Sequence, residues 1–546
     1  MSFRVLVVFI LGMTSTALAT PAGHDAADLL YSSQLSFDSE GTPKVTVGIM
    51  EGQREVVLSC PKGLAIRLSG PAQTQIDVPA GHRIRLSGFG QVPGETHYRV
   101  VLTGMRGGNL DAIASVRRTW GDRDVKVEEI SIGGIVGFPS RILDNRRSLL
   151  VTKDLYSSRE EAEIAAQTLA EKWKLKSVPR VFGQPLKRSK GTVLATDLNS
   201  GLVIRQADLM SFVGADSHPL TVEQVEFGKG YAHHGFEDRR FRGEILVAID
   251  SMGRLAVVNR LSAEHVLQGI VPSEIFPTAP PAALEAQAIA ARSELFAKIG
   301  IRNLADPFLV CATQRCQVYG GINKETEATN LAVQRTRGKM LFDGNDHLVD
   351  AVYSASSGGH TESNEHVWEG TPNPTLRGVF DGRASVAPWP AGTVPSEVQL
   401  AKFLDDPPWT YAGNTTKGRK VFRWVKVIAN DKLTEMVNKR YDIGSVIGID
   451  VLERGVSGRG KRVRFKGTKG DAVMKGELKI RRLLGNMRSS MFQVTQRDGH
   501  WFFKGGGWGH GVGMCQYGAI GMAEAGKTAS RILTTYFSGT KVRTVY

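Results

Sequence analysis

The chain has 546 residues, a formal net charge of +15 at pH 7 and a sequence pI near 9.6. At about 150 residues per domain, this length allows about three domains with their own cores. Its four cysteines, Cys60, Cys311, Cys316 and Cys515, are too few for a fold held together by disulfides. The basic residues are scattered and no nucleic-acid motif accompanies them, so the charge favours contact with anionic cell-envelope polymers over nucleic acid.

The N-terminus predicts a secretory signal peptide. An apolar run at residues 5–13 is followed by the small-residue pattern Ala17-Leu18-Ala19. A membrane anchor is the alternative, but the run is shorter than the ~20 residues that span a bilayer. We therefore expect residues 1–19 to be removed by cleavage near Ala19, leaving an extracytoplasmic protein, in a periplasm or a cell wall, without a transmembrane segment.

Residues 20–125 are predicted to form a β-rich region. Short runs of alternating apolar and polar residues occur at 45–49, 65–68 and 83–86, and glycine and proline separate them. Cys60 lies among these runs and is expected to be a buried apolar residue.

Residues 126–225 are predicted to form a small α+β module. A strand at 147–151 precedes a long helix that begins after Ser157 or Ser158 and ends near Leu175. A strand followed by a capped helix resembles half of the sporulation-related repeat that binds peptidoglycan glycans. An ordinary α+β module without a ligand is the favoured alternative.

Residues 226–546 are predicted to form the largest region, of mixed helices and strands. A hairpin is expected from the runs at 244–249 and 254–258, a short helix capped by Ser262 follows, and a second helix spans 282–298. Strands at 421–427 and 462–465 and a final helix near 530–536 complete an α+β fold.

One carboxylate in this region has surroundings suited to catalysis. Glu274 lies in the sequence Val-Pro-Ser-Glu-Ile-Phe-Pro, residues 271–277, between two predicted helices. Crowding by Ile275 and Phe276 would remove water from the carboxyl group and raise its pKa towards the range of a general acid at neutral pH. A solvated surface glutamate is the alternative.

The segment from Gly505 to Ala519 is dense in glycine and carries Trp508, His510, Gln516 and Tyr517. Glycine allows left-handed backbone or close approach to a ligand, so six glycines within 505–513 suggest a site. The aromatic faces would stack on sugars and the glutamine amide would bind hydroxyl groups. A purely structural turn is the alternative.

Several motifs in a fixed order resemble the stage II sporulation protein D family, which includes the LytB amidase enhancers. They are residues 258–261, 271–277, 283–292, 316–321, 353–362, 457–459, 481–492 and the glycine segment. The resemblance covers roughly 243–546 and implies a catalytic domain of that family within 226–546.

The resemblance implies a lytic transglycosylase that cuts the bond between N-acetylmuramic acid and N-acetylglucosamine in glycan strands without stem peptides. Glu274 would protonate the glycosidic oxygen and then accept the proton of the sugar's own 6-hydroxyl, leaving a 1,6-anhydro end. Because that hydroxyl is the nucleophile, one carboxyl group suffices, whereas hydrolases use two. Arg292 would bind sugar oxygens or steady the charge of Glu274, with a helix-surface ion pair to Glu285 or Glu294 as its alternative.

The matched motifs also imply further substrate contacts, a candidate zinc site and a second function. Gln287, Tyr353 and His360 join the expected substrate-binding residues. The transglycosylase needs no cofactor, but Cys311 and Cys316 with His360 could hold zinc. Arg315 stands where such zinc-binding members have histidine, and a disulfide between the two cysteines is the alternative. A glycan-binding enhancer of an N-acetylmuramoyl-alanine amidase, itself without activity, is the other function.

Overall fold

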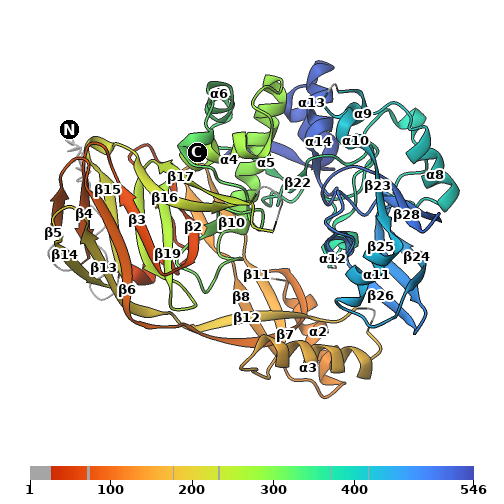
Figure 1. The fold of residues 1–546 in the computed structure, drawn as a ribbon, viewed down its shortest axis with the longest axis horizontal. Helices are drawn as coiled ribbons and strands as arrows, with labels where there is room; N and C mark the ends of the chain where they lie inside the picture. The colour runs from red at the N-terminus through yellow and green to blue at the C-terminus, as the bar shows by residue number, and fades with distance from the viewer. Residues whose placement is uncertain are drawn as a thin grey trace, which may run out of the picture.

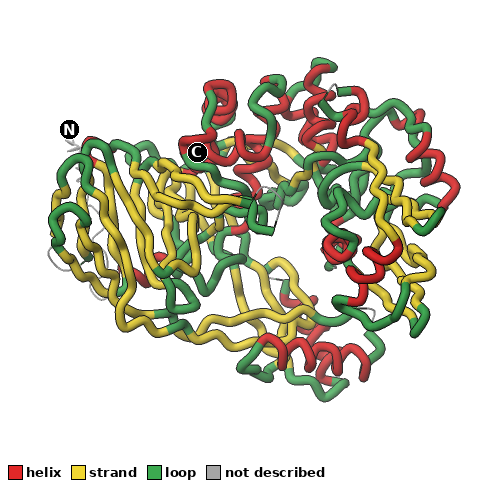
Figure 2. The backbone as a smooth tube through the Cα atoms, viewed as in Figure 1, coloured by secondary structure: helices red, strands yellow, loops and turns green. Residues whose placement is uncertain are grey.

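The computed structural model describes residues 26–69, 74–107, 109–175, 177–230, 234–368, 370–415 and 417–546. The predicted signal peptide lies outside these residues. Within them the chain has a mixed α+β fold, as predicted. Figures 1 and 2 show a β-rich region, a small module, a second lobe and a group of helices placed around the centre of the molecule.

The β-rich region contains two sheets. The larger has the order β1-β2-β19-β18-β15-β4-β5, with β20 parallel to β2. Its strands are β1 (Ser36–Phe37), β2 (Pro43–Gln53), β4 (Leu64–Leu68), β5 (Thr74–Val78), β15 (Leu209–Gly214), β18 (Glu244–Ile249), β19 (Leu255–Ser262) and β20 (Val310–Cys311), and a short helix α1 (Ala26–Leu30) precedes them. The hairpin predicted from 244–258 is β18–β19, so it belongs to this sheet.

The second sheet has the order β14-β13-β6-β3-β16-β17. Its strands are β3 (Glu55–Ser59), β6 (Arg83–Val92), β13 (Lys190–Asp197), β14 (Val203–Ala207), β16 (Leu220–Phe227) and β17 (Gly235–Phe241), with the 3-10 turn η1 (Ala215–Ser217) before β16. Along β6, Ile84 and Leu86 are buried while Arg83 and Arg85 are exposed, because successive side chains of a strand point to opposite faces. The buried residues of both sheets share one hydrophobic core, which includes Cys60.

The small module has the element order strand-helix-strand-strand-helix-strand. It contains β7 (Glu95–Arg106), α2 (Leu110–Gly121), β8 (Val127–Ile132), β11 (Arg147–Thr152), α3 (Arg159–Lys172) and β12 (Arg180–Lys187), and the hairpin β9 (Ile135–Phe138) and β10 (Arg141–Asp144) precedes β11. The sheet order is β12-β7-β11-β8. A capping box at Ser158 begins α3, as predicted.

The predicted boundaries of this module, 126 and 225, differ from the structure. Strand β7 pairs with β11 and β12, so the module begins near residue 95, and it ends near 187 where β13 returns to the β-rich region. Local patterns show where strands lie along the chain, but they do not show which strands pair.

The helical region is built around α5 (Pro281–Lys298), which is buried on nearly every side. It packs against α4 (Ala263–Glu274), α6 (Glu327–Arg335), α13 (Gln516–Glu524) and α14 (Ala529–Tyr536). Ser262 caps α4 and Pro281 opens α5. Short elements complete it: η2 (Ile322–Lys324), β21 (Lys339–Phe342), β22 (Tyr353–Ser354), α7 (Asn364–Trp368), η3 (Ala384–Val386), α9 (Tyr411–Asn414), α10 (Arg419–Phe422), β29 (Met514–Cys515) and β30 (Lys541–Thr544).

Residues 397–506 form most of a second lobe, called here the C-terminal lobe, with a core of its own. Its elements are α8 (Glu397–Asp405), β23 (Arg423–Ala429), α11 (Asn430–Asn438), β24 (Val446–Arg454), β25 (Gly460–Gly467), β26 (Asp471–Lys475), α12 (Glu477–Leu483), β27 (Phe492–Arg497) and β28 (His500–Gly506). Strand β28 leads directly into the glycine segment. Of the helices in the described residues, none is both long and apolar enough to cross a membrane.

Candidate active site

Glu274 is the last residue of α4 and is half-buried. Burial raises the pKa of its carboxyl group to about 8, and the nearby Glu294 carboxylate adds to this, although Val318 N–H donates to Glu274 Oε1 at 2.7 Å and opposes the shift. The direction agrees with the sequence analysis. Ile275 is buried, but Phe276 is 47% exposed, so Phe276 contributes less to the removal of water than expected.

Amide and hydroxyl groups surround this carboxyl group. Gln516 Nε2 donates to the backbone carbonyl of Glu274 at 2.8 Å and to Gln287 Oε1 at 3.1 Å. The Tyr353 hydroxyl donates to Gln317 Oε1 at 2.9 Å. Burial first, and then the Glu274 charge, hold the pKa of Tyr353 well above its ordinary value. Four predicted residues, Glu274, Gln287, Tyr353 and Gln516, therefore lie together.

The glycines of residues 505–513 are explained by packing. Gly507, Gly509, Gly511 and Gly513 all have left-handed backbone, with φ between +72° and +102°. A Cβ atom at Gly511 would lie 2.3 Å from Arg459 Cζ, and one at Gly513 would lie 2.1 Å from a backbone carbonyl oxygen. Close packing within the protein therefore requires glycine at these positions. As a result, the segment places Gln516 beside Glu274.

The other predicted side chains of this segment differ in exposure. Trp508 is 46% exposed, whereas Tyr517 is 8% exposed and its ring centroid lies 5.9 Å from that of Phe276. His510 Nδ1 accepts from Val512 N–H at 3.0 Å, and burial lowers the pKa of His510 to about 3. The imidazole is therefore neutral at neutral pH. Sugar stacking on Trp508 stays a prediction.

Arg292 does not lie in this site, which corrects the sequence analysis. Its side chain is fully buried and forms two hydrogen bonds with the Glu264 carboxylate, at 2.8 and 2.7 Å. It also donates to the backbone carbonyl of Lys339 at 3.1 Å. The surface ion pair considered as an alternative is also wrong, since Glu294 pairs with Lys298 and Glu285 pairs with Arg335. Arg292 joins α5 to α4, and this pairing between helices left no local signal in the sequence.

The structure does not assemble the zinc ligands considered from the sequence. His360 is buried, its Nδ1 donates to the Thr361 carbonyl at 2.8 Å, and its ring stacks on Trp389 at 5.2 Å. Within the described ranges there is no group of three His, Cys, Asp or Glu residues placed to hold a metal. Buried His360 is also no substrate contact. Cys311 and Cys316 lie with their sulfur atoms 2.7 Å apart, and their disulfide stays a prediction.

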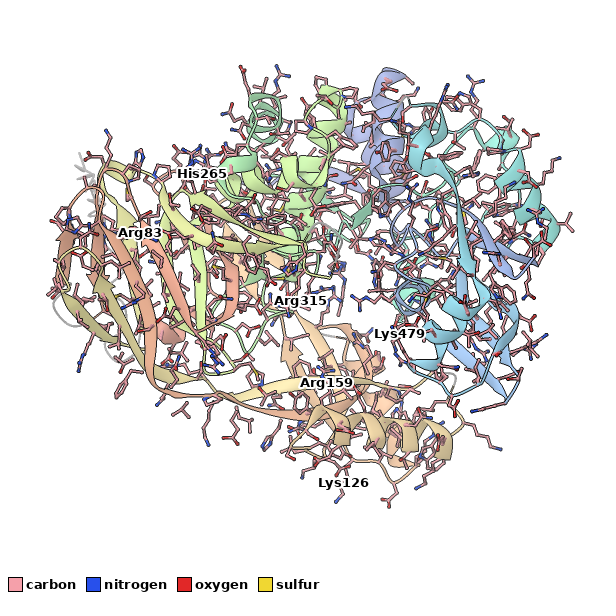
Figure 3. All side chains as sticks on the ribbon, in the orientation of Figure 1. Arg83, Lys126, Arg159, His265, Arg315 and Lys479 are labelled. Carbon is pink, nitrogen blue, oxygen red and sulfur yellow. The ribbon has the colours of Figure 1, made fainter. Side chains whose placement is uncertain are left out.

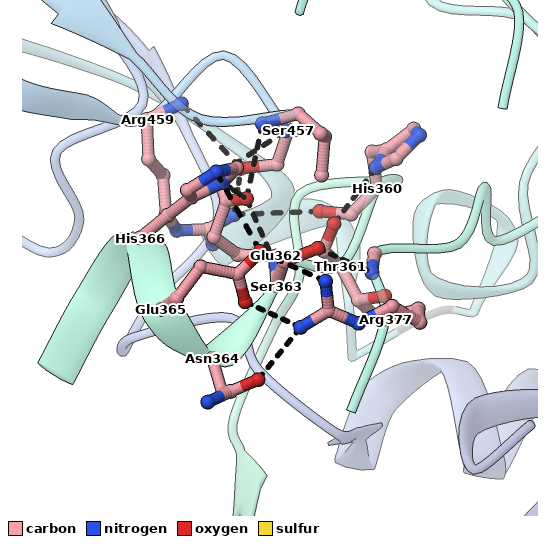
Figure 4. Close-up of polar contacts among 12 residues, drawn as sticks. His360, Thr361, Glu362, Ser363, Asn364, Glu365, His366, Arg377, Ser457 and Arg459 are labelled. Carbon is pink, nitrogen blue, oxygen red and sulfur yellow. Dashed lines mark hydrogen bonds and ion pairs between the residues drawn. The ribbon is translucent and has the colours of Figure 1, made fainter. Parts of the chain in front are cut away.

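Figure 4 shows a polar network around buried Glu362 that no single sequence motif predicted. Glu362 accepts from Ser457 Oγ at 2.6 Å and from His366 Nδ1 at 2.8 Å, and these bonds lower its pKa although burial alone would raise it. Arg459 donates to Ser457 Oγ at 3.0 Å, and Glu362 N–H donates to the Gly511 carbonyl at 2.8 Å. The motifs at 353–362 and 457–459 were the signal, but only the fold shows that they meet.

Comparison with known proteins agrees with the motifs. The family model described as Stage II sporulation protein matches residues 251–342. Stage II sporulation protein D of Bacillus subtilis is 28% identical over 300 residues, 52% of this chain and 75% of that protein. The amidase enhancer of Bacillus subtilis is 30% identical over 300 residues, 50% of this chain.

The chain belongs to the SpoIID/LytB family. An uncharacterized protein of Brachyspira hyodysenteriae is 30% identical over 354 residues, which are 64% of this chain and 82% of that protein. The match spans only 40% of the amidase enhancer's length. A domain of unknown function, DUF8618, matches residues 362–513, which contain the C-terminal lobe and the Glu362 network.

Proposed function

We propose that this SpoIID/LytB family member is an extracytoplasmic lytic transglycosylase that cleaves the MurNAc–GlcNAc bond of peptidoglycan, with denuded glycan strands as substrate. The observation that carries the proposal is Glu274, whose pKa of about 8 keeps its carboxyl group protonated at neutral pH. A general acid has to be protonated before the reaction and within reach of the leaving oxygen.

In the proposed reaction the Glu274 carboxylic acid gives its proton to the glycosidic oxygen, and the bond between that oxygen and C1 of muramic acid breaks. The resulting carboxylate then accepts the proton of the 6-hydroxyl as O6 bonds to C1. The products are a free GlcNAc 4-hydroxyl and a 1,6-anhydro-muramic end, and no water is consumed. The 3.1 Å bond from Gln516 to Gln287 fixes both amides beside the acid.

The second candidate is a glycan-binding enhancer of a cell-wall amidase. A relative named amidase enhancer, 30% identical over half of this chain, supports it. Such a protein would bind glycan with the same surface and would increase the turnover of an amidase partner. It would leave the glycan bonds intact.

Mass spectrometry of denuded glycan after incubation with wild-type and Glu274→Gln protein tests the proposal. We expect 1,6-anhydro ends with the wild type and none with the variant. If neither protein produces these ends while both accelerate a purified amidase equally, the enhancer function holds. Equal yields of anhydro ends from both proteins would exclude Glu274 as the acid.

A further inference from the structure

Two pairs of a cation and an exposed aromatic ring lie beside the site. Lys417 Nζ lies 5.0 Å from the ring centroid of Phe276, two residues beyond Glu274, and it contacts Thr278 Oγ1. Arg488 Cζ lies 5.4 Å from the ring of Trp508, in the segment that delivers Gln516. Nearly half of each aromatic side chain is exposed.

These cations have no carboxylate partner within the part of the chain that the structure describes. Lys417 and Arg488 are exposed, and Arg488 donates only to a backbone carbonyl, that of Lys420, at 3.0 Å. Arg419 and Lys420, which lie between the two pairs along the chain and are also exposed, have no ion pair among the described residues. We call Lys417, Arg419, Lys420 and Arg488 the cationic rim.

The rim lies within a strongly basic stretch of the sequence. Residues 397–506 contain 23 lysines and arginines against 11 aspartates and glutamates. Other arginines of this stretch are neutralised, for example Arg454 by Glu397 and Arg464 by Asp450. The rim therefore presents unneutralised charge over Phe276, two residues beyond Glu274, and over Trp508 of the glycine segment. A ligand that matches these groups has apolar sugar faces and regularly spaced anionic groups.

We infer that the cationic rim binds the lactyl carboxylates of muramic acid residues and thereby selects glycan strands without stem peptides. This inference depends on the proposed function for the identity of the substrate. A stem peptide is joined to the lactyl group through an amide bond, which removes its negative charge. Removal of the peptide restores one carboxylate on every second sugar, and guanidinium and ammonium groups form charge-assisted hydrogen bonds with carboxylates.

Binding experiments in a Glu274→Gln background separate this inference from catalysis, because nothing is cleaved. Four glycans are compared at low ionic strength: denuded strands, denuded strands with lactyl carboxylates converted to methylamides, peptide-bearing strands, and chitin oligosaccharides. The double variant combines Lys417→Gln and Arg488→Gln. A separate variant, Arg488→Lys, retains the positive charge. Lys479→Gln is the matched control, since Lys479 is an exposed lysine of α12 in the same lobe without an ion pair among the described residues (Figure 3).

We expect the double variant to bind denuded strands about tenfold more weakly, because it loses two exposed ion pairs, each of which contributes up to about fivefold to the affinity. Arg488→Lys and Lys479→Gln should bind like the parent. Methylamide, peptide-bearing and chitin glycans should bind the parent and the double variant equally weakly. If the parent binds peptide-bearing or methylamide strands as tightly as denuded strands, the inference is overturned. Charge-selective binding without anhydro ends from the wild type would overturn only the proposed transglycosylase activity.

Discussion

Replacing Glu274 by glutamine tests whether the folded protein keeps this carboxyl group protonated, and it also tests the role of Glu274 in catalysis. Glutamine has nearly the same shape, is neutral at every pH, and its Oε1 can still accept the 2.7 Å bond from Val318 N–H. At neutral pH it therefore resembles the protonated acid that the folded protein contains. Turnover should fall by about 10²–10⁴, the range for loss of a general acid and base.

The effect on stability follows from the raised pKa. The folded protein keeps the Glu274 proton up to pH of about 8, whereas an unfolded chain loses it near 4.5, so this group's contribution to stability falls as pH rises between these values. At pH 7 the raised pKa lowers the free energy of unfolding by at most about 3 kcal/mol, at about 1.4 kcal/mol per pH unit. Because Glu274 is only half-buried, we expect glutamine to raise the free energy of unfolding by about 1–3 kcal/mol at pH 7 and hardly at all at pH 4.5.

Urea denaturation of both proteins at pH 4.5, 6 and 7 measures this difference. The matched control is Glu524→Gln, which changes an exposed glutamate near the end of α13. Its effect on unfolding should be small and should not grow with pH. A difference between wild type and Glu274→Gln that stays constant from pH 4.5 to 7 would refute the conclusion that the fold holds this carboxyl group neutral.

Three further predictions concern the site and its supports. Formation of anhydro ends should fall about tenfold per pH unit above pH 8, because the acid must be protonated; a rate that rises through pH 9 contradicts this. Arg292→Met should lower the free energy of unfolding by about 3–5 kcal/mol, measured in urea, because the mostly shielded Glu264 carboxylate loses its cationic partner and keeps only the Tyr546 hydroxyl as a side-chain donor, while protein that stays folded at low temperature should still form anhydro ends. Glutathione disulfide should oxidise Cys311 and Cys316 with loss of two hydrogen atoms, seen by intact mass and thiol counting; reactivity of both thiols after treatment would exclude the bond.

The sequence predicted the local elements of the fold well. The Ser158 capping box and the Ser262 cap placed two helix starts within one residue, because caps depend on neighbours along the chain. Strand partners were not predictable in the same way. Strand β7 is separated from β12 by the whole module, and the β18–β19 hairpin completes a sheet that starts near residue 36. Such pairings depend on contacts that no local pattern encodes.

In the candidate site, too, features set by neighbours along the chain were predictable and features set by distant contacts were not. The direction of the Glu274 pKa shift was predictable, because buried Ile275 follows it in the sequence, although exposed Phe276 contributes less than expected and Glu294 and Val318 come from other segments. The failures were Arg292 and His360, whose chemistry suggested a site but whose partners, Glu264 and Trp389, come from other parts of the chain. A charged or aromatic side chain in a family motif supports the fold as readily as the reaction, and only its burial and contacts decide between the two.

The environment of Glu274 is a property of the assembled fold. Its carboxyl group is held by Val318, 44 residues away, and its backbone carbonyl by Gln516, 242 residues away. Gln516 in turn depends on the glycine segment, which buried Arg459 of the C-terminal lobe contacts at Gly511. Because this chain of contacts leads from the lobe to the acid, damage to the lobe should lower the pKa of Glu274 by admitting water. The lobe that carries Arg488 of the cationic rim would then also keep the acid protonated.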